Sequence, residues 1–444
     1  PARPVALGPM DGNSTVRIGL LGCGNVGAAL VQLVADNGDA VAARTGLRLE
    51  VTRVAVSDPA RPRPVAFAPG VLTTDAAGVV SDPDVDLVVE VVGGVEPART
   101  LILTALEAGK PVVTANKELL ATHGAELFDA AVKSGVDLLF EAAVCGAIPL
   151  MRPLRESLAG DRISRVIGIV NGTTNFILTR MTEGGDSFAA ALAEAQALGY
   201  AERDPTADVE GFDAAAKAAI IASVAFGIDV RAGDVYREGI TGVTTDDIAM
   251  AARLGYVVKL LAVADSVPGP GGDQVAVRVH PAMIPLAHPL AAVREAYNAV
   301  FIQGDAAGEL MFYGRGAGGR PTASAVLGDV VDAASNLRQG TSASAGVAGL
   351  ATARLRPMDE LESQYYLSLD VADKPGVLER VAHAFSQHGV SIVQVLQLGM
   401  GDEARLMLVT HTARERDMQA TVADLRRLDV VDRVGSLLRV IGPE

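Results

Sequence analysis

Residues 16–27 read V-R-I-G-L-L-G-C-G-N-V-G, and this stretch decides the fold. An apolar strand runs into three glycines spaced as G-x-G-x-x-G, and an apolar pattern with helical spacing follows. The first glycine permits a tight turn, the second lets the backbone approach a pyrophosphate, and the third lets helix and strand pack closely. The N–H groups at the start of the helix then face the phosphates. The stretch predicts a dinucleotide site formed by Gly22, Gly24, Asn25, Val26 and Gly27.

The composition restricts the class of protein. A chain of 444 residues is too long for one core, so two or three domains are expected. A formal net charge of −15 and the lack of a Lys/Arg cluster argue against nucleic-acid binding. Cys23 and Cys145 are the only cysteines, which indicates a reducing compartment. We find neither a signal-peptide pattern nor an apolar run of ~18 residues. We therefore expect a cytoplasmic protein without a membrane anchor.

The second strand, expected at 48–56, bears on the choice of cofactor. An acidic residue at its end would hold the ribose diol of NAD, whereas a nearby arginine would accept the 2′-phosphate of NADP. The sequence offers both, because Asp58 follows the strand and Arg53, Arg61 and Arg63 lie near it. We expect NADP(H) to be preferred and NAD(H) to be possible, with Arg53 among the cofactor contacts.

Two further buried strands are expected at 86–92 and 111–114. In a doubly wound parallel sheet the ligand lies beyond the carboxyl ends of the strands. The residues that end or follow these strands are therefore expected near the cofactor: Gly93, Thr114 and Lys117.

The richest run of polar residues is G-Y-A-E-R-D-P-T-A-D-V-E-G-F-D-A-A-A-K at 199–217. A helix over 212–226 is apolar almost all round, so we expect it to be buried. Asp213 and Lys217 lie one turn apart on this helix. A charged pair without a solvated face must meet a partner or a ligand. A buried lysine can also serve as an acid or a base.

The segments T-A-N-K-E-L-L at 114–120 and F-E-A-A-V-C-G-A-I-P at 140–149 resemble homoserine dehydrogenase. The resemblance continues through the run at 199–217 and covers about 16–336. It implies NAD(P)-dependent interconversion of L-aspartate 4-semialdehyde and L-homoserine, in threonine, methionine and isoleucine biosynthesis.

The family resemblance also implies roles for individual residues. Glu202 and Asp208 would hold the substrate, and Asp213 would orient the reacting group. Lys217 would move the proton, with Lys117 as the other candidate for this role. Two residues of an N-G-T-T-N turn would border the substrate, Gly172 and Thr173. By its residue types alone, this turn predicts a helix that is capped at Asn171.

Three further features follow from the same resemblance. A structural monovalent cation, Na⁺, would be bound by Glu141 and by the backbone carbonyls of Val144, Gly146 and Ile148. Gly318, in a second glycine-rich turn, would approach the cofactor. Strands after residue 255 would form a mixed sheet that pairs with a second subunit, giving a homodimer or homotetramer.

Two alternative functions compete with this interpretation. Cys145 could be the nucleophile of a thiol-dependent semialdehyde dehydrogenase, but no histidine near it in the sequence supplies the base that a thiolate needs. The chain could also be a non-catalytic regulator that senses a dinucleotide. The acidic residues and lysine of 202–217 argue against a sensor of cofactor alone.

The last 80 residues follow a β-α-β-β-α-β order, which is ferredoxin-like. The turn D-K-P-G-V-L at 373–378 resembles an ACT domain, a small-ligand sensor. L-Threonine is the expected effector by pathway logic, and an assembly module is the alternative. The expected effector contacts are Asp373, Gly376, Leu378, Gly389 and Ile392.

The expected fold class is therefore α/β with three domains. A Rossmann dinucleotide-binding domain occupies 1–150, and an α+β domain with a mixed sheet for substrate, catalysis and dimerisation occupies 151–340. The last helix of that second domain is expected to return to the nucleotide domain. A linker at 341–360 leads to a ferredoxin-like ACT domain at 361–444.

Overall fold

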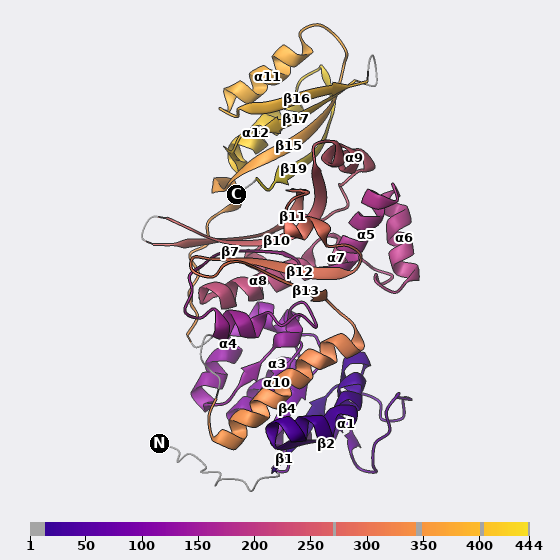
Figure 1. The fold of residues 1–444 in the computed structure, drawn as a ribbon, viewed down its shortest axis with the longest axis vertical. Helices are drawn as coiled ribbons and strands as arrows, with labels where there is room; N and C mark the ends of the chain where they lie inside the picture. Colours follow the sequence, from indigo (N-terminus) through magenta and orange to yellow (C-terminus); the bar gives the residue numbers. More distant parts are fainter. Residues whose placement is uncertain (1–13, 270–271, 343–348, 400–403, 443–444) are drawn as a thin grey trace. The chain divides into compact units, whose positions relative to one another are not determined.

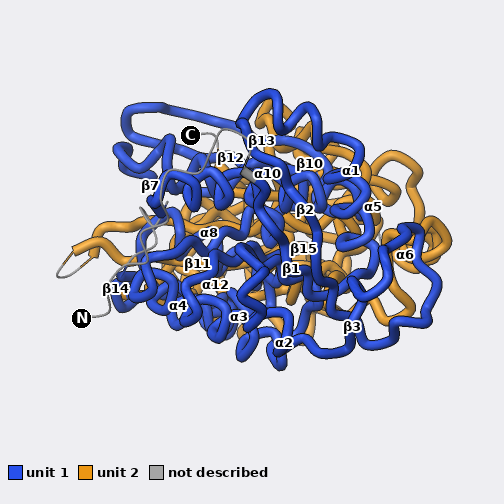
Figure 2. The backbone as a smooth tube through the Cα atoms, turned by 90° about the horizontal axis from the view of Figure 1, so that it is seen from below, with its two compact units in different colours: residues 1–166, 216–235, 298–353 blue, residues 167–215, 236–297, 354–444 orange. Residues whose placement is uncertain are grey.

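A computed structural model describes residues 14–269, 272–342, 349–399 and 404–442. The chain divides into two compact units, drawn in two colours in Figure 2. The first unit comprises residues 1–166, 216–235 and 298–353. The second comprises residues 167–215, 236–297 and 354–444.

The first unit is built on a six-stranded parallel sheet with the order β3-β2-β1-β4-β5-β6. Its strands are β1 (Ser14–Leu21), β2 (Leu47–Ala55), β3 (Leu72–Thr73), β4 (Leu87–Glu90), β5 (Val112–Thr114) and β6 (Leu138–Leu139). The central strand β4 is buried along its whole length, as expected for a sheet covered on both faces. The strand order reverses between β1 and β4, which is where a doubly wound sheet binds its ligand.

Two helices far apart in the sequence pack together on this sheet (Figure 1). They are α1 (Asn25–Thr45) and α10 (Gly319–Gln339), and their apolar faces share one core, with Leu30 and Val330 both fully buried. The other helices after the first strands are α2 (Ala76–Ser81), α3 (Ala98–Glu107) and α4 (Lys117–Ser134). The first unit also contains β8 (Ile228–Asp229), η3 (Ala232–Asp234), β12 (Tyr297–Gly304), β13 (Gly308–Arg315) and β14 (Ala351–Thr352).

The second unit contains a sheet with the order β10-β11-β19-β15-β17-β16. Its strands are β10 (Tyr256–Val267), β11 (Gln274–Pro285), β15 (Glu362–Val371), β16 (Ile392–Leu398), β17 (Arg405–Thr410) and β19 (Val431–Val440). The last strand, β19, pairs with β11 through Ala282 and Arg439, so the C-terminal domain continues this sheet. Helices α11 (Val377–Gln387) and α12 (Glu415–Leu425) cover one face of its C-terminal part (Figure 1).

The second unit contains further α-helices. They are α5 (Gly172–Glu183), α6 (Phe188–Ala197), α7 (Thr206–Val209) and α9 (Thr245–Arg253). Strand β7 (Ile163–Ile169) leads into α5. Helix α8 (Phe212–Phe226) begins in the second unit and ends in the first, and its bounds agree with the expected helix.

The apolar segment 136–141 contains only a short strand, β6. It ends at Leu139, because Glu141 begins a 3₁₀ turn, η1 (Glu141–Ala143). A single π-helical turn, η2 (Pro153–Ser157), follows. Part of the expected linker, 343–348, lies outside the described residues. Among the described residues, no helix has the length and apolarity needed to span a membrane.

Candidate active site

The glycine-rich turn between β1 and α1 lines a cavity of about 480 Å³ in the first unit. Gly22 has a φ of 93°, a conformation that glycine adopts without strain. A Cβ on Gly27 would lie 2.3 Å from the Gly22 carbonyl oxygen, so helix and strand are in close contact there. Gly24 caps α1 without a side-chain hydrogen bond, which leaves the first N–H groups of the helix for an anion. Burial raises the pKa of the Cys23 thiol, so this side chain stays uncharged beside the phosphate position.

Two arginines after β2 line the same cavity. Arg61 and Arg63 both reach its wall, and Arg63 donates to the carbonyls of Asp58 (2.7 Å) and Arg61 (2.8 Å). The Asp58 carboxylate accepts the N–H of Ala60 at 2.9 Å and does not line the cavity. The loop therefore presents positive rather than negative charge to an adenosine ribose.

The side chains of two residues expected at the cofactor make other contacts. The Arg53 guanidinium pairs with Asp82 (Nε–Oδ2 3.1 Å), because Arg53 lies within β2 and not beyond its carboxyl end. The Val26 side chain packs against the apolar core under α1, so a cofactor contact at this position would be made by its backbone. A sequence pattern could not separate Arg53 from the arginines of the following loop.

A second cavity of about 260 Å³ in the first unit brings both lysines together. Lys117 comes from the start of α4 and Lys217 from the second turn of α8, and 8% of Lys217 is exposed. The other residues of the lining include Gly93, Gly94, Asn116, Cys145, Gly146, Gly316, Ala317 and Thr322. Segments from five separate parts of the chain thus surround one small space.

A buried carboxylate organises two of these segments. Glu90 is fully buried at the end of β4, and it accepts the N–H groups of Val92 (2.7 Å) and Gly93 (3.0 Å) and the hydroxyl of Thr114 (2.6 Å). Thr114 therefore supports the cavity wall and does not line it. Asn116 caps α4 by accepting the N–H of Leu119 at 3.1 Å. Sequence reasoning missed Glu90, although a charged residue inside an apolar strand was a visible signal.

The second glycine-rich turn approaches this cavity through residues other than the expected one. Gly316 and Ala317 line it, whereas Gly318 forms the N-cap of α10 with a φ of 129°. A Cβ on Gly146 would lie 2.5 Å from the Gly316 carbonyl oxygen. The two turns are thus in direct backbone contact.

The side chain of Glu141 is bonded to the backbone that follows it. Both carboxylate oxygens of Glu141 accept backbone N–H groups, from Leu150 (2.5 Å), Met151 (2.7 Å) and Arg152 (2.9 Å). The Glu141 side chain therefore closes the turn by bonding to the backbone of residues 150–152.

The backbone of the same turn suits a hard cation. Cys145 and Gly146 have φ values of 56° and 54°, which turns successive carbonyls in unusual directions. Val144 and Ile148 are buried, and among the described residues their carbonyls and that of Gly146 accept no hydrogen bond. Carbonyl oxygens are ligands that hard cations accept.

The candidate substrate site in the second unit is organised by Asn171. Its side-chain oxygen caps α5 by accepting the N–H of Thr174 at 2.8 Å. Its side-chain nitrogen donates to Asp208 (2.6 Å) and Asp213 (2.9 Å). One buried carboxamide therefore fixes both acidic residues relative to the start of α5. Sequence reasoning assigned Asn171 only a capping role.

The other expected substrate contacts surround this cluster. The Thr173 hydroxyl donates to the Tyr200 carbonyl at 2.7 Å, which joins the α5 turn to the segment before α7. Gly172 is in tight contact, since a Cβ there would lie 2.7 Å from the Ala296 carbonyl oxygen. Glu202 is exposed.

Helix α8 connects these groups to the lysine. Asp213 and Lys217 are each 8% exposed and lie one turn apart on this helix. Asp213 is hydrogen-bonded to Asn171, and Lys217 lines the cavity with Lys117. These two residues are the charged side chains of α8, and both lie in its first half.

The expected effector residues lie at the two ends of α11. Gly376 is the N-cap of this helix with a φ of 88°, and Gly389 follows the helix with a φ of 67°. The Asp373 carboxylate accepts from Gln397 at 3.2 Å. Leu378 is 50% exposed, and Ile392 begins β16.

Comparisons with known proteins agree with this geometry. The profile of the homoserine dehydrogenase NAD-binding domain matches residues 22–141, the homoserine dehydrogenase profile matches 149–331, and the ACT domain profile matches 365–430. Homoserine dehydrogenase of Corynebacterium glutamicum is 51% identical over 428 residues, which is 96% of each chain. The chain belongs to the homoserine dehydrogenase family. A Bacillus subtilis homoserine dehydrogenase is 42% identical over 96% of this chain and 98% of the relative.

Solved structures extend the agreement to the fold. A homoserine dehydrogenase from Thiobacillus denitrificans superposes with a TM-score of 0.90 at 40% identity, covering 96% of this chain and 98% of the other. A hyperthermophilic archaeal homoserine dehydrogenase in complex with NADPH has a TM-score of 0.59 at 28% identity, covering 72% and 97%. Membership of this family confirms the expected oxidoreductase, the Rossmann-type domain, the mixed sheet and the ACT domain. The two alternatives, a non-catalytic sensor and a thiol-dependent dehydrogenase, receive no support.

Proposed function

We propose that this homoserine dehydrogenase uses Lys217 as the group that exchanges a proton with the substrate oxygen. In the oxidative direction, Lys217 Nζ takes the proton of the homoserine hydroxyl. A hydride leaves the carbon that bears this hydroxyl, which gives the aldehyde. A nicotinamide dinucleotide held by the glycine-rich turn at Gly22, Gly24 and Gly27 would supply the hydride acceptor. In the reductive direction the ammonium form of Lys217 returns the proton. The observation that carries this proposal is the cavity shared by Lys217 and Lys117.

The acidic residues supply recognition of the amino acid. Asp208 and Asp213, held by Asn171, place negative charge where the substrate ammonium group can bind. Lys117 supplies positive charge on the nucleotide side, suited to polarise the carbonyl oxygen. Glu202, which is exposed, is the third acidic residue of this group. A folded sample that reduces neither NADP⁺ nor NAD⁺ in the presence of L-homoserine would refute the proposed reaction.

We infer that NADP(H) is the preferred cofactor. Arg61 and Arg63 line the cavity next to the glycine-rich turn, and the Asp58 carboxylate is occupied by a backbone N–H. Replacing Arg61 by Ala should raise KM for NADPH and leave KM for NADH unchanged. An enzyme whose kcat/KM is much higher with NADH would contradict this inference.

We also propose that Na⁺ occupies the turn after Glu141. The ligands would be the backbone carbonyls of Glu141, Val144, Gly146 and Ile148, since the Glu141 carboxylate is already hydrogen-bonded. Such a cation would fix the turn that contacts Gly316. Thermal unfolding in NaCl against tetramethylammonium chloride at equal ionic strength tests this, and equal midpoints would count against it.

The assembly proposed is a homodimer or homotetramer. Among the described strands, β13 pairs with β12 alone and so has one free edge, and Met311 (37%) and Tyr313 (54%) on it are exposed. A second copy of this chain would cover them. Light scattering should give a mass of at least two chains, and a Tyr313→Lys variant should shift toward one chain.

We propose that the ACT domain binds L-threonine through the turns at the ends of α11. Backbone groups around Gly376 and Gly389 are available to an amino acid, and Asp373 can accept its ammonium group. L-Threonine at millimolar concentration should inhibit the full-length enzyme and should inhibit an Asp373→Ala variant less. Full activity of the wild type in threonine would contradict this regulation.

A further inference from the structure

The last strand of the chain, β19, carries a buried arginine. Arg439 is 1% exposed, and its neighbours across the sheet are Ala282 of β11 and Tyr365 of β15. A buried guanidinium is tolerated when carboxylates and hydrogen bonds compensate for its lost hydration. The partners of Arg439 therefore identify the segments that it holds together.

Arg439 binds two carboxylates from separate parts of the chain. Glu415, the first residue of α12, accepts from Nε (2.9 Å) and from Nη2 (2.7 Å) and is 4% exposed. Glu415 also accepts the hydroxyl of Tyr365 at 2.9 Å, so it belongs to the packed interior of the ACT domain. Glu238, which follows the short strand β9 (Tyr236–Arg237), accepts from the same Nη2 at 2.9 Å. One guanidinium thus connects the ACT domain to the segment around residue 238.

The segment around Glu238 is fixed by further contacts. Tyr236 donates its hydroxyl to the Glu238 carboxylate, and the centroid of its ring lies 5.4 Å from Cζ of Arg439. The N–H of Glu238 donates to the carbonyl of Val279 on β11 at 2.8 Å. Both the side chain and the backbone of Glu238 are therefore bound, and these contacts fix the course of the chain at residues 236–238.

The residues after Glu238 lie against the turn between α7 and α8. Gly239 is in close contact with this turn, since a Cβ there would lie 2.3 Å from the carbonyl oxygen of Val209. The N–H of Ile240 donates to the same carbonyl at 2.8 Å, and Ile240 is fully buried. The end of α7 is therefore bound to the segment that Arg439 holds.

The next residue of the turn, Glu210, is bound by the same segment. Arg237 donates to the Glu210 carbonyl at 3.2 Å, and the Thr241 hydroxyl donates to the Glu210 carboxylate at 3.0 Å. The guanidinium of Arg237 also lies over the ring of Phe212, 3.5 Å from its centroid. Segment 236–241 thus contacts the end of α7, the turn itself and the start of α8.

The two acidic residues of the substrate site lie on either side of this turn. Asp208 is in α7, directly before Val209, and Asp213 is in the first turn of α8. Both carboxylates accept from the side chain of Asn171. A shift of the turn would therefore change how the two carboxylates are placed relative to Asn171.

We propose that Arg439 is a positioning residue for the substrate, because through Glu238 it holds segment 236–241 against the turn that carries Asp208 and Asp213. This role rests on the proposed recognition of the substrate ammonium group by these two carboxylates. They bind the substrate and do not exchange its proton, so the contribution of Arg439 should appear in KM for homoserine and not in kcat. The last strand of the chain then serves the substrate site as well as the ACT sheet.

The test is steady-state kinetics of full-length variants with L-homoserine and NADP⁺. Glu238→Ala is the main variant, because the Glu238 side chain is 33% exposed and its loss leaves Arg439 paired with Glu415. We expect KM for homoserine to rise about tenfold, with kcat and KM for NADP⁺ unchanged. Glu238→Gln should recover part of the loss, since its amide oxygen can still accept from Arg439.

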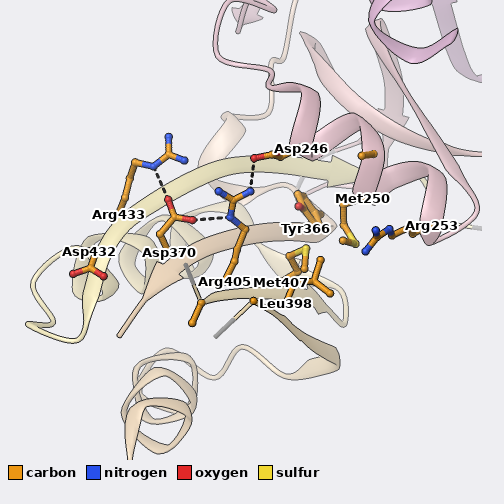
Figure 3. A pocket seen from close by; sticks show the side chains of 13 residues that line it. Asp246, Met250, Arg253, Tyr366, Asp370, Leu398, Arg405, Met407, Asp432 and Arg433 are labelled. Atoms are coloured by element: carbon orange, nitrogen blue, oxygen red, sulfur yellow. Dashed lines mark hydrogen bonds and ion pairs between the residues drawn. The ribbon is translucent and has the colours of Figure 1, made fainter. Parts of the chain in front are cut away.

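A double variant separates positioning from a general loss of stability. Arg439→Lys keeps a positive charge but loses the planar fork, so it should also raise KM for homoserine. Arg439→Lys combined with Glu238→Ala should have the KM of Glu238→Ala alone, because both substitutions break the same contact. The matched control is Arg433→Met, which removes an arginine of the same strand whose partner, Asp370, lies within the ACT domain (2.8 Å; Figure 3). This control should keep the KM of the wild type.

Three results would overturn the proposal: a wild-type KM for homoserine in Glu238→Ala, a further rise of KM in the double variant, or an equal rise of KM in Arg433→Met. A wild type that binds L-homoserine in calorimetry but does not oxidise it would refute the proposed reaction and not the positioning role. The role is then tested on the Kd of L-homoserine, which should rise about tenfold in Glu238→Ala. An unchanged Kd in that variant would overturn it.

Discussion

Substitution of Asn171 separates the structural part of the substrate site from its functional part. The side chain has two tasks, because its oxygen caps α5 and its nitrogen donates to Asp208 and Asp213. Asn171→Ala removes both. Asn171→Asp keeps an oxygen for the N–H of Thr174 and replaces the donor by a third negative charge. The two variants should therefore differ in stability and in catalysis.

The expected magnitudes follow from the contacts. Loss of an N-cap costs about 1 kcal/mol, and each hydrogen bond to a charged group contributes about 1.5–3 kcal/mol. We expect Asn171→Ala to lower kcat/KM for homoserine about 10²-fold, which corresponds to about 2.7 kcal/mol. Asn171→Asp should lower kcat/KM further, because carboxylates now face one another at the distances of the lost hydrogen bonds, 2.6 and 2.9 Å.

The assay combines steady-state kinetics with denaturant unfolding. Ser187→Ala is the matched control, since Ser187 caps α6 by accepting the N–H of Ala190 and contacts no carboxylate of the site. It should lose about 1 kcal/mol of stability and keep its kcat/KM. Wild-type kcat/KM in Asn171→Asp would refute the reasoning. So would an Asn171→Ala variant whose only defect is the stability loss seen in Ser187→Ala.

Three further predictions concern catalysis, pH and packing. Lys217→Ala should lower kcat about 10²–10⁴-fold; if Lys117→Ala has the larger effect on kcat while Lys217→Ala keeps near-normal turnover, the two roles are reversed. Burial lowers the pKa of Lys259 to about 8, against about 10.4 in the unfolded chain, so the unfolded state holds the extra proton between these values. The free energy of unfolding should therefore gain up to about 1.4 kcal/mol per pH unit from pH 8 to 10 relative to Lys259→Met, and parallel pH profiles would exclude this. Gly27→Ala should prevent dinucleotide binding, since its Cβ would lie 2.3 Å from a backbone oxygen, whereas Gly38→Ala, with nothing within 4 Å of the added Cβ, should bind normally in a fluorescence titration.

Features that depend on neighbouring residues could be predicted from the sequence. The glycine spacing of 22–27 and the apolar pattern around it were enough for the first strand, turn and helix. The bounds of α8 and the burial of Lys217 followed from a helix without a polar face. Capping by Asn171 also followed from its side chain, which competes locally for a free N–H.

Features that depend on distant segments were decided by the tertiary structure. Arg53 and Arg61 are the same residue type at nearby positions in the sequence. In the structure Arg53 forms an ion pair with Asp82, and of the two only Arg61 lines the cavity. Glu141 had the residue type of a metal ligand, yet three backbone N–H groups nine to eleven residues later take up its carboxylate. The amide of Asn171 reaches Asp208 and Asp213 about forty residues away. The sequence of each segment determines which groups it carries, whereas their partners depend on which segments the packed core brings within hydrogen-bond distance.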